Sequence, residues 1–522
     1  MRTPSHTKEY EKIGPAVPDR KKGREQMRAS GILMPLFSLP GKYGIGCFSE
    51  EAYRFVDFLK KAGQKYWQIL PVGPTGFGDS PYQSFSTFAG NPYFISPDEL
   101  VRQGLIRKED IPMPGKDARE DRVDYGWLYN TRYEVLRKAF QSWKEKKHPD
   151  FEEFLDENRY WIEDYALFMA EKQHFGGRSF SEWDADIRFR RPEAMETAKT
   201  ELADEILYHE YIQYEFDREW KSLKKYANEN GIEIIGDIPI YVSPDSADFW
   251  AHPELFQTDE NHLPTSVAGC PPDGFSADGQ LWGNPLYDWE YHKKTGYDWW
   301  LKRITKCAQL YDVIRIDHFR GFDEYYSIKF GSPNAIGGHW CKGPNIDLFD
   351  TIREKIGNIR IIAEDLGYIT DTVKQMVRET GYPNMKVIEF AFDSRDSSGR
   401  AAYFPYNYDR NCVVYTGTHD NETLVGWLGD ILPEERQELK DYLGTDTEDD
   451  REIADLTIRL VESSVSDLCV VPLQDWLGLD NSARINHPST TGTNWVWRVL
   501  DGQIKDELAE KIYRICTIYG RI

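Results

Sequence analysis

The segment DVIRIDHFRGF (312–322) carries the pattern that decides the fold. An apolar, β-branched run leads directly into charged residues and then into a glycine. This pattern is typical of a strand that is buried on both faces and ends at a functional edge. Seven more segments repeat it: 31–39, 66–74, 232–242, 359–367, 384–392, 411–420 and 467–476. Strands of this kind belong to parallel sheets that helices cover on both sides.

Helical patterns lie between several of these predicted strands. In the clearest, 49–62, Ser49 stands at the N-cap position and Glu50 and Glu51 occupy the first turn, while Gly63 follows the last turn. Eight buried strands that alternate with helices predict an α/β fold, a parallel (β/α)8 TIM barrel.

The chain is longer than one barrel needs, because it has 522 residues against roughly 250 in a typical barrel. Residues 75–231 are mostly helical in pattern and predict an inserted subdomain, with helices at 127–147, 151–175 and 201–230. Residues 243–310 predict a second, aromatic-rich insertion. Residues 1–30 predict a flexible polar leader in front of a barrel domain at 31–522, and too few residues follow the eighth strand for a separate C-terminal β-domain.

Composition argues against several classes of function. The chain has 64 Lys and Arg against 87 Asp and Glu, a net charge of −23, so we expect no nucleic-acid partner. No apolar run approaches the roughly 20 residues that a transmembrane helix needs, so we expect no membrane partner either. Seven scattered cysteines without a C-x-x-C pair, and an N-terminus without the apolar core of a secretory signal, predict a cytoplasmic protein.

Aromatic residues make up 14% of the chain, and many lie in Gly/Pro-rich loops such as 79–94 and 275–291. Aromatic faces beside polar groups suit ligands that are apolar on one face and hydroxylated at the edge, as sugars are.

Acidic and histidine side chains gather where the predicted strands end, which is where a barrel carries its chemistry. They are Asp237, Asp317, His318, Glu364, Asp365, His419 and Asp420. One aspartate after a strand is usually a helix cap or half of an ion pair. Acidic side chains at several strand ends together indicate a catalytic site instead.

Two carboxyls fit complementary roles. Arg315 lies two positions before Asp317, so both side chains face the same way, and we expect the cation to lower the pKa of Asp317 and keep a nucleophile ionised. The alternative is a buried Arg–Asp pair that joins two strands. Glu364 follows the apolar IRIIA, and desolvation should raise its pKa, as a general acid requires. Retaining glycoside chemistry uses such a pair, with the carboxyls about 5–5.5 Å apart.

A metal-dependent barrel hydrolase is an alternative at this point. Its ligands would be Asp237, His318, Glu364, His419 and Asp420. Such sites usually rest on several histidines, and the sequence has neither an H-x-H after the first strand nor an H-E-x-x-H.

Three motifs in order, RIDHFRGF (315–322), AEDLG (363–367) and THDNET (418–423), resemble the 4-alpha-glucanotransferases, or amylomaltases, of the α-amylase clan. The resemblance covers nearly the whole chain from about residue 31. The further matching segments are SPYQSFSTFAGNPY, GDIPIYV, VAGCPPDGFSADGQLWGNPLYDW, MKVIEFAF and RINHPSTTGTNW.

The resemblance implies Asp317 as nucleophile, Glu364 as general acid/base and Asp420 as the residue that stabilises the transition state. It implies substrate-binding roles for Tyr82, Asp237, Asp273, Trp282, Arg315, His318, Phe390, His419 and Asn486. It also implies a mobile loop at about 268–284 over the bound chain, and neither a metal nor an organic cofactor. Many relatives read N-x-P-G-T where this chain has Asn486, Pro488 and Ser489, so we expect the subsite there to differ.

The implied reaction is transfer of α-1,4-glucan segments to the 4-hydroxyl of glucose or another maltooligosaccharide, through a glycosyl group held on Asp317. An α-glucan hydrolase of the amylase type remains an alternative, since spacing does not identify the acceptor. So does a non-catalytic glucan-binding protein, although such a protein has no need of three carboxylates.

Overall fold

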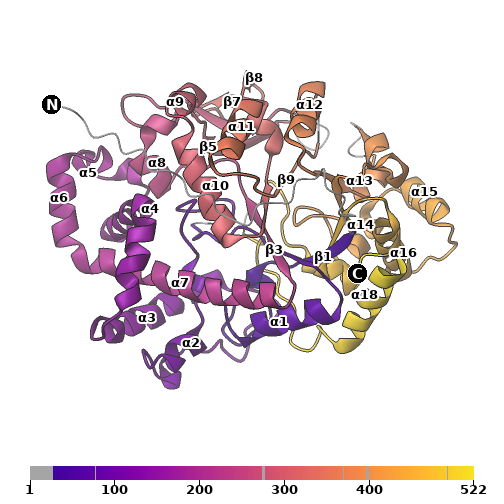
Figure 1. Ribbon diagram of the computed structural model, residues 1–522, viewed down its shortest axis with the longest axis horizontal. Coiled ribbons are helices and arrows are strands. Elements are labelled where there is room, and N and C mark those ends of the chain that lie inside the picture. Colours follow the sequence, from indigo (N-terminus) through magenta and orange to yellow (C-terminus); the bar gives the residue numbers. More distant parts are fainter. Residues whose placement is uncertain (1–27, 77, 273–276, 368, 395–398, 491) are drawn as a thin grey trace.

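The barrel is closed and parallel in the computed structural model, which describes residues 28–76, 78–272, 277–367, 369–394, 399–490 and 492–522 (Figure 1). Its strands are β1 (Ala29–Leu33), β2 (Tyr66–Gln68), β3 (Glu233–Ile238), β6 (Val313–Ile316), β9 (Ile361–Ala363), β10 (Asn384–Val387), β11 (Cys412–Tyr415) and β12 (Leu468–Pro472). Each pairs with the next of these in chain order, and β12 pairs with β1. The predicted TIM-barrel fold is confirmed.

The barrel interior is filled by alternate side chains of the strands. Because successive strand residues point to opposite faces, one set meets inside and the other packs under the helices. The inner set forms its own cluster: Leu33, Ile235, Val313, Ile362, Met385, Val387, Val413, Tyr415 and Val470. We refer to it as the barrel-interior cluster.

Several strands are shorter than predicted. After β10 ends at Val387 the chain forms the short helix α13 (Glu389–Phe392), so the prediction that Phe390 lies in a strand is wrong. The apolar run continues past the strand because Ala391 and Phe392 are buried in the helix. Near the N-terminus, β1 begins at Ala29, two residues before the predicted strand. Residues 1–27 lie outside the described part.

Helices α2–α7 lie between β2 and β3 and gather on one side of the barrel in Figure 1. They are α2 (Pro97–Arg102), α3 (Tyr125–Lys144), α4 (Pro149–His174), α5 (Ala185–Arg188), α6 (Pro192–Glu201) and α7 (Ala203–Glu229). The three long ones, α3, α4 and α7, match the helices that the sequence predicts within 75–231.

The other helices follow the strands along the chain. They are α1 (Glu50–Lys61), α8 (Ala247–Ala251), α9 (Trp289–Lys294), α10 (Asp298–Leu310), α11 (Ile346–Lys355), α12 (Asp371–Thr380), α14 (Leu424–Asp430), α15 (Pro433–Leu443), α16 (Asp450–Ser463), α17 (Leu473–Trp476) and α18 (Asp506–Ile518). Of the helices in the described ranges, none has the length and apolar character that a bilayer crossing requires.

A second sheet, antiparallel and absent from the sequence-based prediction, stands beside the barrel. Its order is β5 (Gln280–Pro285), β4 (Ser266–Cys270), β7 (Glu324–Lys329) and β8 (His339–Lys342). β4 and β5 flank the central part of the predicted loop 268–284, and β7 follows the segment that carries Asp317. The sheet therefore connects β4 and β5, which flank that loop, to β7, which follows β6 in the chain.

Candidate active site

Asp317 directly follows β6 and is held in place from two directions. Its backbone N–H donates to the carbonyl of Ile238, 2.9 Å away, and Arg315 Nη1 donates to its Oδ1 at 3.0 Å. The same Nη1 lies 2.7 and 2.6 Å from the two carboxylate oxygens of Asp237. Asp237 and Arg315 are register partners on β3 and β6, and Asp237 is fully buried. Arg315 thus joins two strands and also contacts Asp317.

A close backbone approach explains the glycine in front of Asp237. A Cβ at Gly236 would lie 2.1 Å from the ring of Tyr311, so a larger residue in β3 would push this ring away. In the GDIPIYV motif, packing against Tyr311 therefore requires the glycine, and the ion pair with Arg315 requires the aspartate.

Glu364 occupies the equivalent place on the neighbouring strand, since Ile316 and Ala363 are register partners on β6 and β9. The backbone N–H of His318 donates to its Oε2 at 2.6 Å, and that of Leu366 donates to its Oε1 at 2.8 Å. His318 adopts a left-handed backbone (φ 53°), which turns the chain after Asp317. The two carboxyls therefore belong to adjacent strand ends.

Burial raises the pKa of both carboxyls. The pKa of Asp317 rises to about 6, because desolvation outweighs Arg315. Arg315 lowers this pKa as expected, but burial is the larger effect, so the expectation of a net lowered pKa for Asp317 is wrong. Burial, reinforced by the charge of Asp317, raises the pKa of Glu364 to about 8 against its two backbone donors, as predicted. Between these values Asp317 is ionised and Glu364 is protonated.

Asp420 is the third carboxylate. Asn486 Nδ2 donates to its Oδ1 at 2.6 Å, and His419 Nε2 lies 3.1 Å from its Oδ2. Burial alone would raise the pKa of Asp420, but the charge and hydrogen bonds of His419 and Asn486 lower it to about 2. This group stays ionised throughout the range in which Asp317 and Glu364 change charge.

Tyr82 connects the two sides of the site. Its ring stacks on His419 with 5.1 Å between centroids and 16° between planes, and its hydroxyl donates to Asp237 Oδ2 at 3.0 Å. Nine of the predicted residues therefore form one contact network: Tyr82, Asp237, Arg315, Asp317, His318, Glu364, His419, Asp420 and Asn486.

Trp282, on β5, reaches this network through His318. Their rings meet edge to face at 4.8 Å and 90°, and the Trp282 indole N–H donates to Gln280 Oε1 at 3.0 Å. Burial lowers the pKa of His318 to about 3, so this imidazole is neutral at neutral pH.

Of the predicted residues that the structure describes, Phe390 stands outside the network. Phe390 packs edge to face on Tyr403, with 5.3 Å between centroids, and against the barrel-interior cluster. Asp273 lies outside the described residues, as does 274–276 of the predicted loop 268–284.

Sequence reasoning missed Arg484 and Trp495. Arg484 Nη2 donates to the carbonyl of Asp420 at 2.8 Å, and Trp495 packs on the rings of Tyr82 and His419 at 5.8 and 5.9 Å. Trp495 adopts a left-handed backbone (φ 63°), which is unusual for a bulky residue. Both residues lie in RINHPSTTGTNW, the motif that also contains Asn486, so the matching segment carries the signal for them.

The donor set does not fit a metal site. Among the residues that the structure describes, no group of three or more His, Cys, Asp and Glu side chains is arranged to hold a metal ion. The geometry therefore gives the metal-hydrolase alternative no support.

Comparisons with known proteins agree with the geometry. The sequence profile of a family described as 4-alpha-glucanotransferase matches residues 34–503. The chain is 49% identical to the 4-alpha-glucanotransferase of Clostridium butyricum over 94% of this chain and 100% of that protein. It is 45% identical to that of Thermus thermophilus over 95% and 100%.

A solved structure, the amylomaltase from Streptococcus agalactiae in complex with acarbose, is 43% identical and superposes with a TM-score of 0.91 over 95% of this chain and 99% of that chain. The amylomaltase from Corynebacterium glutamicum, at 18% identity, has a TM-score of 0.71 over 95% and 75%, and so shares the fold.

Proposed function

This chain belongs to the 4-alpha-glucanotransferase family, and we propose that Asp317, Glu364 and Asp420 carry out its transfer reaction. The enzyme acts on α-glucans, and the hydrolase alternative is not favoured. The observation that carries the residue assignment is the placement of two buried carboxyls at the ends of adjacent strands, with Asp317 bound by Arg315 and Glu364 held by two backbone N–H groups. Burial raises the pKa of Glu364 further than that of Asp317, to about 8 against about 6, which favours a protonated Glu364 beside an ionised Asp317.

The first step forms the glycosyl-enzyme. An Asp317 carboxylate oxygen attacks the anomeric carbon of the donor, and the glycosidic C–O bond breaks. The Glu364 proton moves to the departing oxygen, so the leaving sugar departs with its 4-hydroxyl restored. This leaves a covalent bond between Asp317 and the donor and a charged Glu364.

The second step reverses these movements with a new sugar. Glu364 takes the proton from the acceptor's 4-hydroxyl, whose oxygen attacks the anomeric carbon and releases Asp317. Two inversions retain the α configuration. The proposed acceptor is glucose or a maltooligosaccharide.

Asp420 serves both steps without changing its charge. Its carboxylate is held by Asn486 and His419, so it faces the oxocarbenium-like transition state as a fixed negative group. Arg315 and buried Asp237 act on the substrate through Asp317 and Tyr82. The remaining proposed sugar contacts are Tyr82, Asp273, Trp282, His318, Phe390, His419 and Asn486.

Incubation with maltotriose alone tests the acceptor. We expect glucose together with a ladder of longer maltooligosaccharides, separated by chromatography, because a second sugar accepts the glycosyl group. A reaction that yields only glucose and maltose would show that water is the acceptor. We expect the loop at about 268–284, which begins in β4 and ends in β5, to exclude water from the site.

Glu364→Gln tests the general acid. We expect kcat/KM on maltotriose to fall by roughly 10²- to 10⁴-fold, the usual contribution of such a group. Glucosyl fluoride needs no proton for its leaving group, so formation of the intermediate from this donor should be largely spared. Equal losses on the two donors would contradict the assignment.

The pH dependence of kcat/KM follows from the two raised pKa values. The reaction needs Asp317 unprotonated, so the rate should fall as the pH drops below about 6. It also needs Glu364 protonated, so the rate should fall as the pH rises above about 8. In Glu364→Gln the alkaline limb should disappear while the acid limb remains. An unchanged alkaline limb in that variant would assign it to another group.

A further inference from the structure

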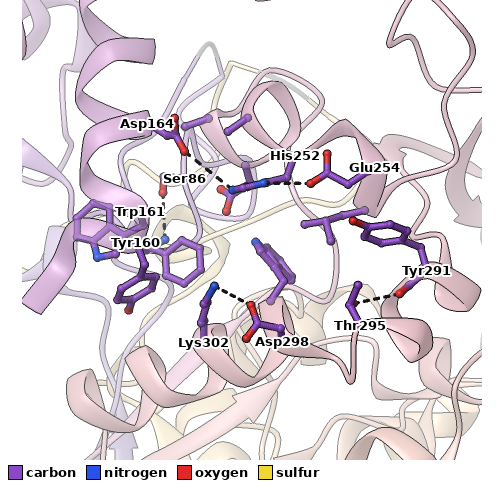
Figure 2. Close-up of a pocket in the computed structure, with 16 residues that line it drawn as sticks. Ser86, Tyr160, Trp161, Asp164, His252, Glu254, Tyr291, Thr295, Asp298 and Lys302 are labelled. Atoms are coloured by element: carbon purple, nitrogen blue, oxygen red, sulfur yellow. Dashed lines mark hydrogen bonds and ion pairs between the residues drawn. The ribbon is translucent and has the colours of Figure 1, made fainter. Parts of the chain in front are cut away.

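A pocket with a volume of about 220 Å³ lies outside the barrel, where the two insertions meet (Figure 2). One wall comes from α4, with Tyr160, Trp161 and Asp164. The other walls come from α8, from η5 (Pro253–Leu255) and from the ends of α9 and α10. None of the residues lining this pocket belongs to the contact network of the active site.

The pocket has room for one ring. Drug-sized ligands occupy sites of about 300–1,000 Å³, whereas a cavity of about 150 Å³ holds benzene. A single six-membered ring with its substituents therefore matches the space, and a longer ligand would leave the rest of its length outside.

One side of the pocket is built from aromatic rings. Tyr160 is 38% exposed and meets Phe88 edge to face, with 5.6 Å between centroids. Phe88 in turn packs on Trp161 at 6.2 Å and on Trp299 at 6.1 Å. A rigid aromatic wall of this kind suits the C–H face of a sugar ring.

The polar side carries charge that is already compensated. Asp298 pairs with Lys302 at 2.6 Å, Glu254 lies 3.3 Å from His252 Nδ1, and Asp164 pairs with Arg190 (Figure 2 shows the first two). Acidic side chains outnumber basic ones in the lining, which disfavours an anion. Because these carboxylates have partners, a cationic ligand would gain little. A neutral ligand with several hydroxyls fits both conditions.

We propose that this pocket binds the terminal glucosyl unit of an α-glucan, as a second site apart from the catalytic centre. A chain held there by one end keeps its remaining length close to the protein and raises its effective concentration at the active site. A short oligosaccharide cannot occupy both sites at once, so it gains nothing. The inference rests on the enzyme's action on α-glucans and assigns a function to the contact between 75–231 and 243–310.

Calorimetric titration with maltotriose tests the site in the Asp317→Asn background, where substrate is not consumed. We expect two binding sites in this parent and one after Tyr160→Ala. Tyr129→Ala is the matched control, since Tyr129 is an exposed tyrosine on α3 outside the pocket lining, and it should keep both sites. One site in the parent, or two after Tyr160→Ala, would overturn the pocket assignment and leave the transferase function intact. No binding at all would overturn both.

Kinetics of the otherwise native enzyme provide the second measurement. Tyr160→Ala should raise KM for amylose about tenfold, which corresponds to about 1.4 kcal/mol, with kcat and all constants for maltotriose unchanged. Thr295→Trp should do the same, because it fills the pocket from an exposed position in its lining. Equal KM values for amylose in the native enzyme and both folded variants would refute the proposal. A cyclic glucan has no end, so its displacement of maltotriose from this site would refute the terminal-unit assignment.

Discussion

Asp317→Asn should lower kcat/KM on maltotriose by roughly 10⁴-fold or more, the scale on which other enzymes lose activity with their covalent nucleophile. The amide keeps the shape of the side chain and can still accept from Arg315, but its oxygen is too weak a nucleophile to displace a sugar. Product formation measured by chromatography at pH 7 gives the result. Turnover close to that of the native enzyme would remove Asp317 from the proposed role.

The same substitution should not destabilise the protein. Folding raises the pKa of Asp317 to about 6 from its ordinary value of 3.8, so the charged form is the one that folding disfavours. Stability from this group is present at low pH and is lost as the pH rises through the folded pKa. At pH 7 a neutral amide should therefore leave the unfolding temperature unchanged or raise it. A large fall would mean that lost activity reflects lost structure.

Asp365→Asn is the matched control. Asp365 is a buried carboxyl next to Glu364, but it accepts from the backbone N–H of Met385 at 3.0 Å and from the Asn384 side chain, and it is not part of the catalytic network. We expect activity per folded molecule to stay within a few-fold of the native enzyme. A loss as large as that of Asp317→Asn would make the assay uninformative about the nucleophile.

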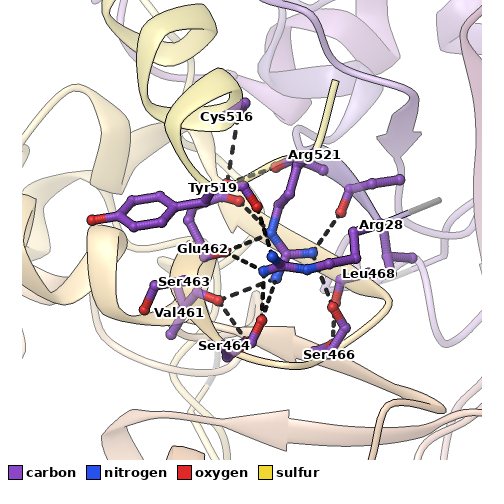
Figure 3. Close-up of polar contacts among 12 residues, drawn as sticks. Arg28, Val461, Glu462, Ser463, Ser464, Ser466, Leu468, Cys516, Tyr519 and Arg521 are labelled. Carbon is purple, nitrogen blue, oxygen red and sulfur yellow. Dashed lines mark hydrogen bonds and ion pairs between the residues drawn. The ribbon is translucent and has the colours of Figure 1, made fainter.

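Arg521→Met should produce the largest loss of stability. Arg521 is fully buried beside Glu462, with 2.8 Å between Nε and Oε2, and its Nη1 donates to the carbonyls of Ala29 and Ser466 at 2.9 and 3.1 Å (Figure 3). Ser30 Oγ completes the cluster by donating to Glu462 Oε1 at 2.6 Å. The cluster connects the start of β1 to the end of α16 and to the segment before β12.

Removing the cation leaves Glu462 buried without its partner, which typically costs about 3–5 kcal/mol of unfolding free energy. Denaturant titration measures this loss. The double variant Arg521→Met, Glu462→Leu should recover part of it, because the carboxylate that lost its partner is removed as well. Arg410→Met is the control, since the exposed Arg410 lies 3.4 Å from the partly buried Asp467, and ion pairs with a solvent-exposed partner contribute about 0–1 kcal/mol. Equal losses at the two arginines would contradict this account.

The barrel could be predicted because its strands are nearly continuous apolar runs, whereas the second sheet could not. β8 (His339–Lys342) is largely exposed, and β5 mixes glycine, proline and polar residues. Their pairing depends on β4 and β7, which are separated in sequence by α9, α10 and β6. No local sequence pattern predicts which of these strands pair. Phe390 shows the complementary error, in which burial extends an apolar run beyond the strand.

The carboxyls of the site could be predicted because strand ends and motifs mark them. Not all of their charge states could be predicted. Spacing placed Arg315 beside Asp317 correctly. It could not show that Arg315 is shared with Asp237, nor how far burial opposes it. For Glu364 the apolar strand in front already signalled desolvation, and there the predicted direction is confirmed.

The seam between β1 and β12 also has a consequence for how the chain folds. Gly31 pairs with Val470, so the ring closes between segments at opposite ends of the described chain. Contacts of such high sequence separation slow folding, because loop entropy is lost before they form. Until closure, β1 and β12 are open strand edges, and open edges template association between molecules. Refolding yield should therefore fall with protein concentration, through aggregation of the open-ring intermediate.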